Sequence, residues 1–130
     1  AQLNAEQLAV ELDVEFHECD LFPEDEGSEY DLILSNPPYI PADAIDALDP
    51  EVRLHEPRAA LNGGPDGLRI IQRIIEGAPA RLRSGGSLLL EVGVGQSAKV
   101  AAMGRNAGFR VNGIHDDLAG LPRVVEFRRK

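Results

Sequence analysis

The hydrophobic and polar residues of the chain follow two periods, one typical of helices and one typical of strands. Apolar residues at helical spacing predict helices over 1–12, 65–83 and 96–108. Alternating or continuous apolar runs predict strands over 14–19, 31–35, 85–93, 109–115 and 123–129. Because strands and helices alternate along the chain, the sequence predicts an α/β fold with a largely parallel sheet.

Residues inside these elements predict where the core lies. The second helix carries an apolar stripe formed by Leu68, Ile71, Ile74 and Ile75. The run 31–35 is read as continuously apolar, which predicts a strand buried on both faces. The segment 40–64 contains several prolines and a glycine pair and has no clear period, so we expect a lid or binding loop there.

The charge of the chain narrows the kind of partner it can bind. It carries 13 Lys and Arg residues against 22 Asp and Glu residues, a net charge of −9, and its visible basic cluster is 128–130. Contacts to phosphates supply most of the affinity for nucleic acids, so we expect no direct nucleic-acid ligand. A basic segment of a protein suits this charge better.

Cysteine, membrane and metal signals are few. The single Cys19 cannot form an internal disulfide, which fits a reducing, cytoplasmic compartment, and we expect it to be a small buried residue. No apolar run approaches the ~20 residues that span a membrane. The histidines His17, His55 and His115 lie far apart and lack ligand spacing, so no metal site is predicted.

The strand at 31–35 runs directly into Asn36-Pro37-Pro38-Tyr39. One interpretation is a stop signal, because proline ends a strand and Asn before proline favours a turn. One proline would suffice for that, however, and the motif adds a second proline and an aromatic ring. Two prolines remove two N–H donors, which leaves the Asn36 side-chain oxygen and the Pro37 carbonyl as acceptors. At the carboxyl end of a strand, where α/β sheets bind ligands, this surface suits a planar NH2 group.

A second motif follows the strand at 85–93 and opens a helix. Residues 93–98 read GVGQSA and match the glycine fingerprint of nucleotide sites, in which Gly93 and Gly95 would cradle the ligand. Asp116-Asp117, about 20 residues further on, would bind its ribose. Only 13 residues follow Asp117, fewer than the further βα units of such a site need, which argues against this interpretation.

Four stretches together resemble a known enzyme family. They are NPPY at 36–39, PEVRLHEPRAALNGGPDGLRIIQRII at 50–75, LRSGGSLLLEVGVGQ at 82–96 and HDDLAGLPRVV at 115–125. In this combination they resemble the HemK-type protein-(glutamine-N5) methyltransferases that act on peptide chain release factors, over essentially all 130 residues. NPPY alone is shared with other amino methyltransferases, whereas its combination with HEPRAALNGGPDGL is specific.

The resemblance implies a Rossmann-like class I methyltransferase fold that lacks its first two strands. Residues 1–130 would be the C-terminal portion of an S-adenosyl-L-methionine-dependent methyltransferase domain, without the N-terminal helical domain that binds the protein substrate. The family's glycine-rich loop and ribose carboxylate would also precede Ala1. With two strand edges unpaired, we expect self-association, and we expect no methyl transfer by this chain alone.

The resemblance also implies roles for individual residues. Asn36 and Pro37 would be catalytic, and the whole motif 36–39 would bind the substrate glutamine. Asp20 and Leu21, with Asn36, would hold the adenine of the cofactor, although without the resemblance Asp20 fits a strand-end cap equally well.

Glu56 has two interpretations. It would line the substrate groove, or it would form a salt bridge with Arg53 or Arg58, as charged surface residues commonly do.

Together these expectations predict N5-methylation of a glutamine side chain, with S-adenosyl-L-methionine as cofactor and a cytoplasmic location. The partner would be the glutamine-bearing loop of a peptide chain release factor. Three alternatives stay open: a ribosomal-protein glutamine methyltransferase, a nucleic-acid amino methyltransferase, which the charge disfavours, and a non-catalytic fragment.

Overall fold

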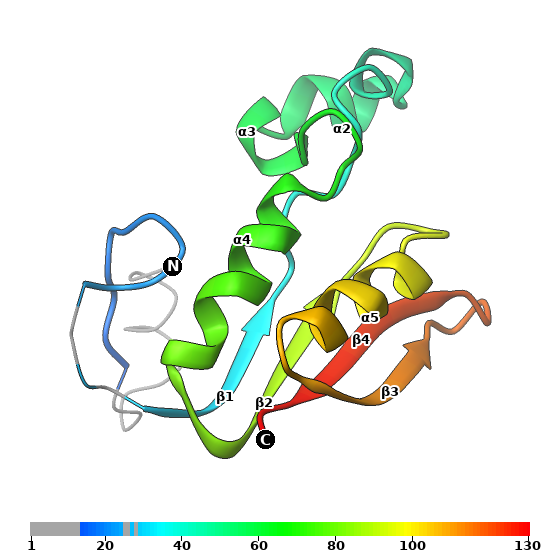
Figure 1. The fold of residues 1–130 in the computed structure, drawn as a ribbon. Helices are drawn as coiled ribbons and strands as arrows, with labels where there is room; N and C mark the ends of the chain where they lie inside the picture. The colour runs from blue at the N-terminus through cyan, green and yellow to red at the C-terminus, as the bar shows by residue number, and fades with distance from the viewer. Residues whose placement is uncertain (1–13, 25–26, 28) are drawn as a thin grey trace.

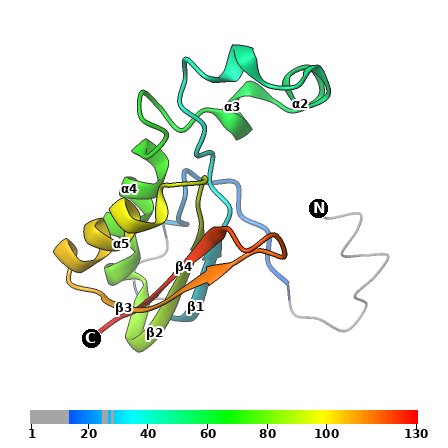
Figure 2. The ribbon, with the colours of Figure 1, turned by 90° about the vertical axis from the view of Figure 1, so that its right-hand side faces the viewer.

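The computed structural model describes residues 14–24, 27 and 29–130, and for 52–54 the backbone alone. Its centre is a sheet with the strand order β1-β2-β4-β3, and the helices α4 and α5 lie on one face of that sheet (Figures 1 and 2). The strands are β1 (Tyr30–Ser35), β2 (Leu82–Glu91), β3 (Arg110–Asp116) and β4 (Pro122–Arg128). The helix expected at 1–12 lies outside the described residues.

The α/β class is confirmed, and the sheet of the described strands is mixed. β1 runs parallel to β2, as expected, whereas β4 lies antiparallel to both β2 and β3. β3 and β4 follow each other in the chain through a tight turn, in which the Asp117 N–H donates to the Leu121 carbonyl. A connection this short joins only antiparallel strands.

The helical layer consists of α4 (Arg69–Gly77) and α5 (Ser97–Asn106). The apolar stripe predicted for the first of them is confirmed, because Leu68, Ile71, Ile74 and Ile75 are all buried. They share one core with the buried sheet residues Leu88, Leu90, Val125 and Phe127. The helix is shorter than predicted, because a 3-10 turn, η2 (Ala78–Ala80), with proline in its first turn, leads directly into β2.

β1 forms an edge of the sheet in the described part of the chain, which corrects the expectation of a strand buried on both faces. Leu32 and Leu34 are 48% and 67% exposed, while Tyr30 and Ile33 pack against the core. The reason is that β1 pairs only with β2 among the described strands, and that α4 and α5 cover the other face of the sheet.

Residues 14–19 form no strand, although their apolar residues alternate. Val14 and Phe16 are exposed, and Cys19, which was expected to be buried, is an exposed free thiol. Alternation produces a strand only where a neighbour completes the backbone hydrogen bonds, and none of the described strands pairs with this segment.

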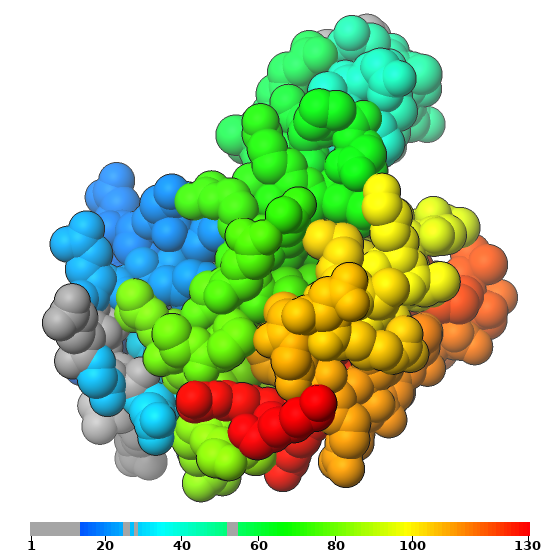
Figure 3. Space-filling model, viewed as in Figure 1, coloured from blue at the N-terminus to red at the C-terminus, as the bar shows by residue number. Residues whose placement is uncertain are grey.

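The segment 40–64, predicted as a loop, contains short helical turns, which are η1 (Ile45–Ala47), α2 (Pro50–His55) and α3 (Arg58–Leu61). Each is too short to show a helical period in the sequence. Backbone hydrogen bonds at Ile40 close the base of the segment, since its N–H donates to Leu61 and its carbonyl accepts from Gly63. Beyond this base the segment projects past the end of β1 (Figures 1 and 3). We call residues 40–64 the projecting lobe.

The helices that the structure describes are all too short or too polar to cross a membrane.

Acidification is expected to weaken the pairing of β3 with β4. Hydrogen bonds with His115 Nε2 at 2.9 Å and Asn112 Nδ2 at 2.6 Å lower the pKa of Glu126 from its ordinary 4.5. A pKa that is lower in the folded than in the unfolded state stabilises the fold above the unfolded value, and this stability is lost as the pH falls through the folded value. We therefore expect the free energy of unfolding, measured by urea denaturation, to decrease below pH 4.5.

The variant Glu126→Gln should show a shallower decrease over the same pH range. Equal slopes for the two proteins would contradict this role of Glu126.

Candidate active site at the end of β1

The NPPY motif lies where β1 ends and the projecting lobe begins. Ser35, the last residue of β1, pairs with Leu90, and residues 36–39 follow without regular structure. Pro37 is buried, whereas Asn36 is exposed. The motif therefore stands at the carboxyl end of a strand that runs parallel to its neighbour, which is the position at which α/β sheets bind ligands.

The motif lines a groove of about 410 Å³. Residues 36–40 line it together with Glu56, Ala60 and Leu61 of the projecting lobe. We call it the NPPY groove. The side chain of Asn36 forms no hydrogen bond with the part of the chain that the structure describes, so its amide is available to a ligand. Asn36 also lines a second hollow, of about 310 Å³, with Leu34 and other residues of the open face of the sheet.

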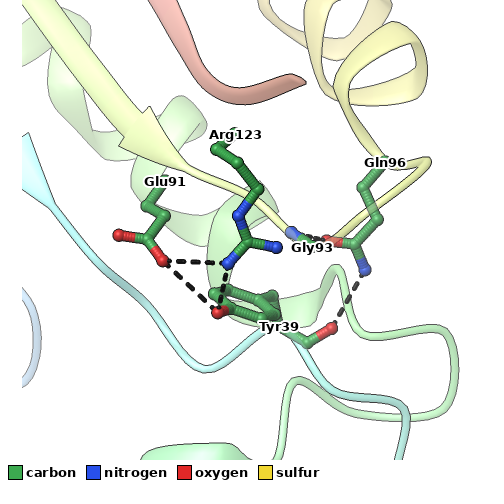
Figure 4. A network of polar contacts seen from close by, with 5 residues as sticks. All are labelled: Tyr39, Glu91, Gly93, Gln96 and Arg123. Atoms are coloured by element: carbon green, nitrogen blue, oxygen red, sulfur yellow. Dashed lines mark hydrogen bonds and ion pairs between the residues drawn. The ribbon is translucent and has the colours of Figure 1, made fainter. Parts of the chain in front are cut away.

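Tyr39 is held at its hydroxyl by two charged side chains (Figure 4). Arg123, from β4, donates to this hydroxyl at 2.8 Å, and its guanidinium lies 5.2 Å from the ring centroid. The hydroxyl donates to Glu91 Oε1 at 3.3 Å, and Arg123 donates to the same oxygen at 3.2 Å. Burial lowers the pKa of Arg123, but the Tyr39 hydroxyl and the Glu91 carboxylate outweigh it, so the pKa lies above its usual value. Arg123 therefore stays cationic in the folded protein.

Tyr39 is held a second time, at its carbonyl (Figure 4). Gln96 donates through Nε2 to this oxygen at 3.0 Å and accepts through Oε1 from the Gly93 N–H at 2.8 Å. Gly67 leaves the space for the contact, since a β-carbon there would lie 2.2 Å from the Tyr39 oxygen. Its φ of +75° is also one that glycine adopts at little cost. Three segments that are distant in the sequence therefore meet at Tyr39.

The same contacts argue against a nucleotide fingerprint at 93–98. The Gly93 N–H, which would face a phosphate, is bound by Gln96, and a β-carbon at Gly93 would lie 3.2 Å from the Tyr39 ring. Asp117, half of the expected ribose pair, accepts two backbone N–H groups of its own turn. Gly93 thus makes room for protein groups rather than for a ligand.

The structure does not bring the expected adenine-binding residues together with Asn36. Asp20 accepts a hydrogen bond from Arg73 on α4 at 2.6 Å, and this bond and the Arg73 charge lower the pKa of Asp20. Asp20 lines a separate hollow of about 540 Å³. Leu21, at φ +72°, packs against the core. The alternative role of Asp20 as a strand-end cap fails as well, because no strand forms at 14–19.

Glu56 was expected either to line the substrate groove or to form a salt bridge with Arg53 or Arg58. In the structure it lines the NPPY groove. Arg58, one of its expected partners, pairs instead with Asp46 at 3.2 Å, and the side chain of Arg53 is not described. Among the described residues, none forms an ion pair with Glu56. As far as the described side chains go, the Glu56 carboxylate is available to a ligand in the groove. No group of three or more His, Cys, Asp or Glu side chains within the described ranges is arranged to hold a metal ion.

Sequence reasoning did not identify Glu91, Gln96 and Arg123 as parts of this site. They lie 52, 57 and 84 residues from Tyr39 in the chain. Gln96 lies inside the glycine motif at 93–98, but that motif predicts a ligand cradle formed by its glycines and assigns no role to the glutamine.

Known proteins resemble the chain in sequence over most of its length, although no protein-family model matches it. It is 53% identical over 98 residues to a release factor glutamine methyltransferase of Cereibacter sphaeroides, a match that covers 75% of this chain and 35% of that protein. It is 45% identical over 125 residues to the protein of the same name in Geobacter sulfurreducens, covering 96% of this chain and 43% of that protein. The chain thus spans less than half the length of these curated relatives.

Solved structures resemble the chain in fold. A release-factor-specific protein-(glutamine-N5) methyltransferase of Alicyclobacillus acidocaldarius has a TM-score of 0.51 and 31% identity, over 80% of this chain and 51% of that one. A methyltransferase of Pyrococcus furiosus, 17% identical with a TM-score of 0.53 over 78% of this chain and 42% of that one, shares the fold. The described strands and helices thus form part of a Rossmann-like class I methyltransferase fold. In sequence and in fold, the chain is similar to release factor glutamine methyltransferases over most of its own length.

Proposed function

We propose that this chain carries the glutamine-binding part of an enzyme that transfers a methyl group from S-adenosyl-L-methionine to the side-chain nitrogen of a glutamine in a peptide chain release factor. The observation that carries the proposal is the NPPY groove, in which the Asn36 amide is exposed and unbonded within the described structure. The names of the curated relatives support the substrate class. A cytoplasmic setting agrees with the free thiol of Cys19.

The NPPY groove offers what an amide nucleophile requires. A glutamine nitrogen reacts poorly because its lone pair is delocalised into its own carbonyl. Two acceptors aimed at its two N–H bonds orient the nitrogen and stabilise the positive charge that develops as the new C–N bond forms. Asn36 Oδ1 and the Pro37 carbonyl are these acceptors in our proposal. The amide proton leaves to water after the transfer, so no general base has to act before it.

S-adenosyl-L-methionine supplies an electrophilic methyl group bonded to a positively charged sulfur. Asp20 and Leu21 are our candidates for holding its adenine end. Asp20 can exchange Arg73 for an adenine amine at little cost, because the Asp20 side chain is 76% exposed and exposed ion pairs contribute little. Asn36 lines a separate hollow from Asp20, so the expected contact of Asn36 with the adenine does not fit this structure, and Asn36 is assigned to the glutamine alone.

The groove and the charge favour a protein loop as substrate. Pro38, Tyr39 and Leu61 give it apolar surface, and Glu56 adds a carboxylate near Asn36. With a net charge of −9, the chain attracts a basic, flexible loop better than a phosphodiester. Holding the glutamine nitrogen in line with the methyl group can lower the barrier by up to ~7–11 kcal/mol in favourable cases.

The test compares the 130-residue chain with the same chain joined after the N-terminal residues that precede the matched region in the Geobacter sulfurreducens relative. Both proteins are titrated calorimetrically with S-adenosyl-L-methionine and then incubated with a release factor and labelled cofactor. We expect the joined chain to label the release factor, and to stop labelling it when the acceptor glutamine is replaced by leucine. We expect the 130-residue chain alone to bind the cofactor weakly and to label nothing.

Two results would contradict the proposal. The first is labelling of a ribosomal protein or a nucleic acid in place of the release factor. The second is a low-micromolar Kd of the 130-residue chain for S-adenosyl-L-methionine that Gly95→Val abolishes, since this would restore the fingerprint at 93–98 as the cofactor site.

A further inference from the structure

We propose that Gln96 is a positioning residue for the NPPY motif: its side-chain amide fixes the Tyr39 carbonyl and thereby sets where Asn36 points in the groove. The catalytic consequence rests on the function proposed above, whereas the positioning itself does not. Gln96 forms no hydrogen bond with Asn36 and does not line the groove as the structure describes it, so it acts through the backbone of Tyr39.

The motif depends on anchors outside itself. Pro37 and Pro38 have no N–H, so neither can tie the backbone to the body of the protein by donating a hydrogen bond. The chain is secured before the motif by the pairing of Ser35 with Leu90, and after it by the backbone bonds of Ile40. After Asn36, the first backbone group of the motif that bonds to a side chain from elsewhere in the described chain is the Tyr39 carbonyl. Its partner is Gln96. The direction of Asn36 therefore depends on Ser35 before it and on the placement of Tyr39 after it.

The chemistry of Gln96 suits this role and fixes its orientation. Oε1 faces the Gly93 N–H, and Nε2 faces the Tyr39 carbonyl. The reversed amide would place donor against donor and acceptor against acceptor, so only one orientation satisfies both contacts. The two bonds join Gly93, just beyond the end of β2, to Tyr39, at the end of the motif that follows β1, and β1 and β2 are paired parallel strands.

Two glycines allow the Tyr39 carbonyl and the Gln96 amide to approach each other this closely, since a β-carbon on either glycine would clash with them. A β-carbon at Gly67 would lie 2.2 Å from the Tyr39 oxygen and 2.7 Å from Gln96 Nε2. A β-carbon at Gly93 would lie 2.9 Å from Gln96 Oε1. At the other end of the residue, Arg123 holds the Tyr39 hydroxyl. Tyr39 is thus fixed at two separate points, and only Gln96 acts on its backbone through a side chain among the described residues.

Two substitutions separate the two bonds of Gln96. Gln96→Glu keeps an acceptor for the Gly93 N–H but sets a carboxylate oxygen against the Tyr39 carbonyl, so it removes the positioning bond alone. Gln96→Met removes both bonds at similar volume. Gln72→Glu is the matched control, because Gln72 lies exposed on α4 and its side chain bonds only to Glu76 among the described residues.

The first measurement uses NMR on the 130-residue chain and needs no activity. We expect the side-chain NH2 signals of Asn36 and the ring signals of Tyr39 to shift or broaden in both Gln96 variants and to stay unchanged in Gln72→Glu. We expect amide exchange at Gly93 to accelerate in Gln96→Met and to remain slow in Gln96→Glu. A purely structural role would move the signals of Asn36 only together with those of the core.

The second measurement uses the joined chain described above. In Gln96→Glu we expect kcat to fall about 10- to 100-fold with little change in the KM for S-adenosyl-L-methionine, because misplacement of the acceptor by about 1 Å has effects of this size.

Three results would overturn the role of Gln96. They are Asn36 and Tyr39 signals in Gln96→Glu that match those of Gln72→Glu, a kcat for Gln96→Glu equal to that of the control, and failure of Gln96→Glu to fold while the control folds. If the joined chain with the natural sequence transfers no methyl group, the proposed function fails, and the NMR comparison still decides whether Gln96 positions the motif.

Discussion

Replacing Asn36 with alanine in the joined chain is expected to lower kcat about 100- to 1,000-fold, because one oriented group of this kind is commonly worth ~2.7–4 kcal/mol in the transition state. The Asn36 side chain lies exposed in the NPPY groove and makes no hydrogen bond within the described residues, so its loss leaves the fold intact. The affinity for S-adenosyl-L-methionine should change only modestly. Single-turnover methyl transfer to the release factor measures the rate of the chemical step, and calorimetry measures the affinity for S-adenosyl-L-methionine.

Asn106→Ala provides the matched control for this substitution. Asn106 is the last residue of α5, is also exposed, and lies outside the NPPY groove. We expect kcat in this variant to equal that of the unchanged protein. A decrease of less than tenfold in Asn36→Ala would show that Asn36 does not orient the substrate amide.

Replacing Phe127 with alanine is expected to lower the free energy of unfolding by about 3–5 kcal/mol, which is the usual cost of removing a large buried aromatic ring. Phe127 is fully buried in the layer between β4 and α5, and its ring lies 5.6 Å from that of Phe109. Urea denaturation of the 130-residue chain measures the change. A loss below about 1 kcal/mol would mean that the layer of helices does not pack on the sheet as described.

Gly104 on α5 allows a sharper test of the same contact. A β-carbon at Gly104 would lie 2.1 Å from the Phe127 ring, so Gly104→Ala alone should destabilise the protein by about 1–3 kcal/mol through overpacking. In the Phe127→Ala background the same substitution meets no ring, and it should be neutral or stabilising. Additive losses in the double variant would contradict this packing.

The local pattern of the sequence was sufficient to predict those elements that carry a clear hydrophobic period or a clear stop signal. The stripe Leu68, Ile71, Ile74 and Ile75 could be read because each helical turn repeats the same burial. The position of NPPY at the end of a strand could be read for a similar reason, since a short apolar run stopped by proline is a local signal. The composition likewise determined the net charge of −9 and the single cysteine.

Burial and pairing could not be read from the same patterns. Residues 14–19 alternate like a strand but remain irregular, and β1 is apolar on a face that the described helices do not cover. Whether an alternating segment forms a strand depends on a neighbouring strand with which it can pair. That strand can lie far away in the sequence, so the residues of the segment alone do not reveal it. The short helices of the projecting lobe were missed for a different reason, because fewer than two turns give no measurable period.

What the sequence by itself determined is therefore the α/β class, the apolar stripe of α4 and the position of the surface formed by Asn36-Pro37-Pro38-Tyr39 at the end of a strand. Only the tertiary structure decided how this surface is held. Arg123 and Gln96 reach Tyr39 from 84 and 57 residues away, and Gly67 fits the same point because it lacks a β-carbon. Contacts of this kind leave no local pattern, because hydrogen bonds and close approaches depend on distances in space and not on separation along the chain.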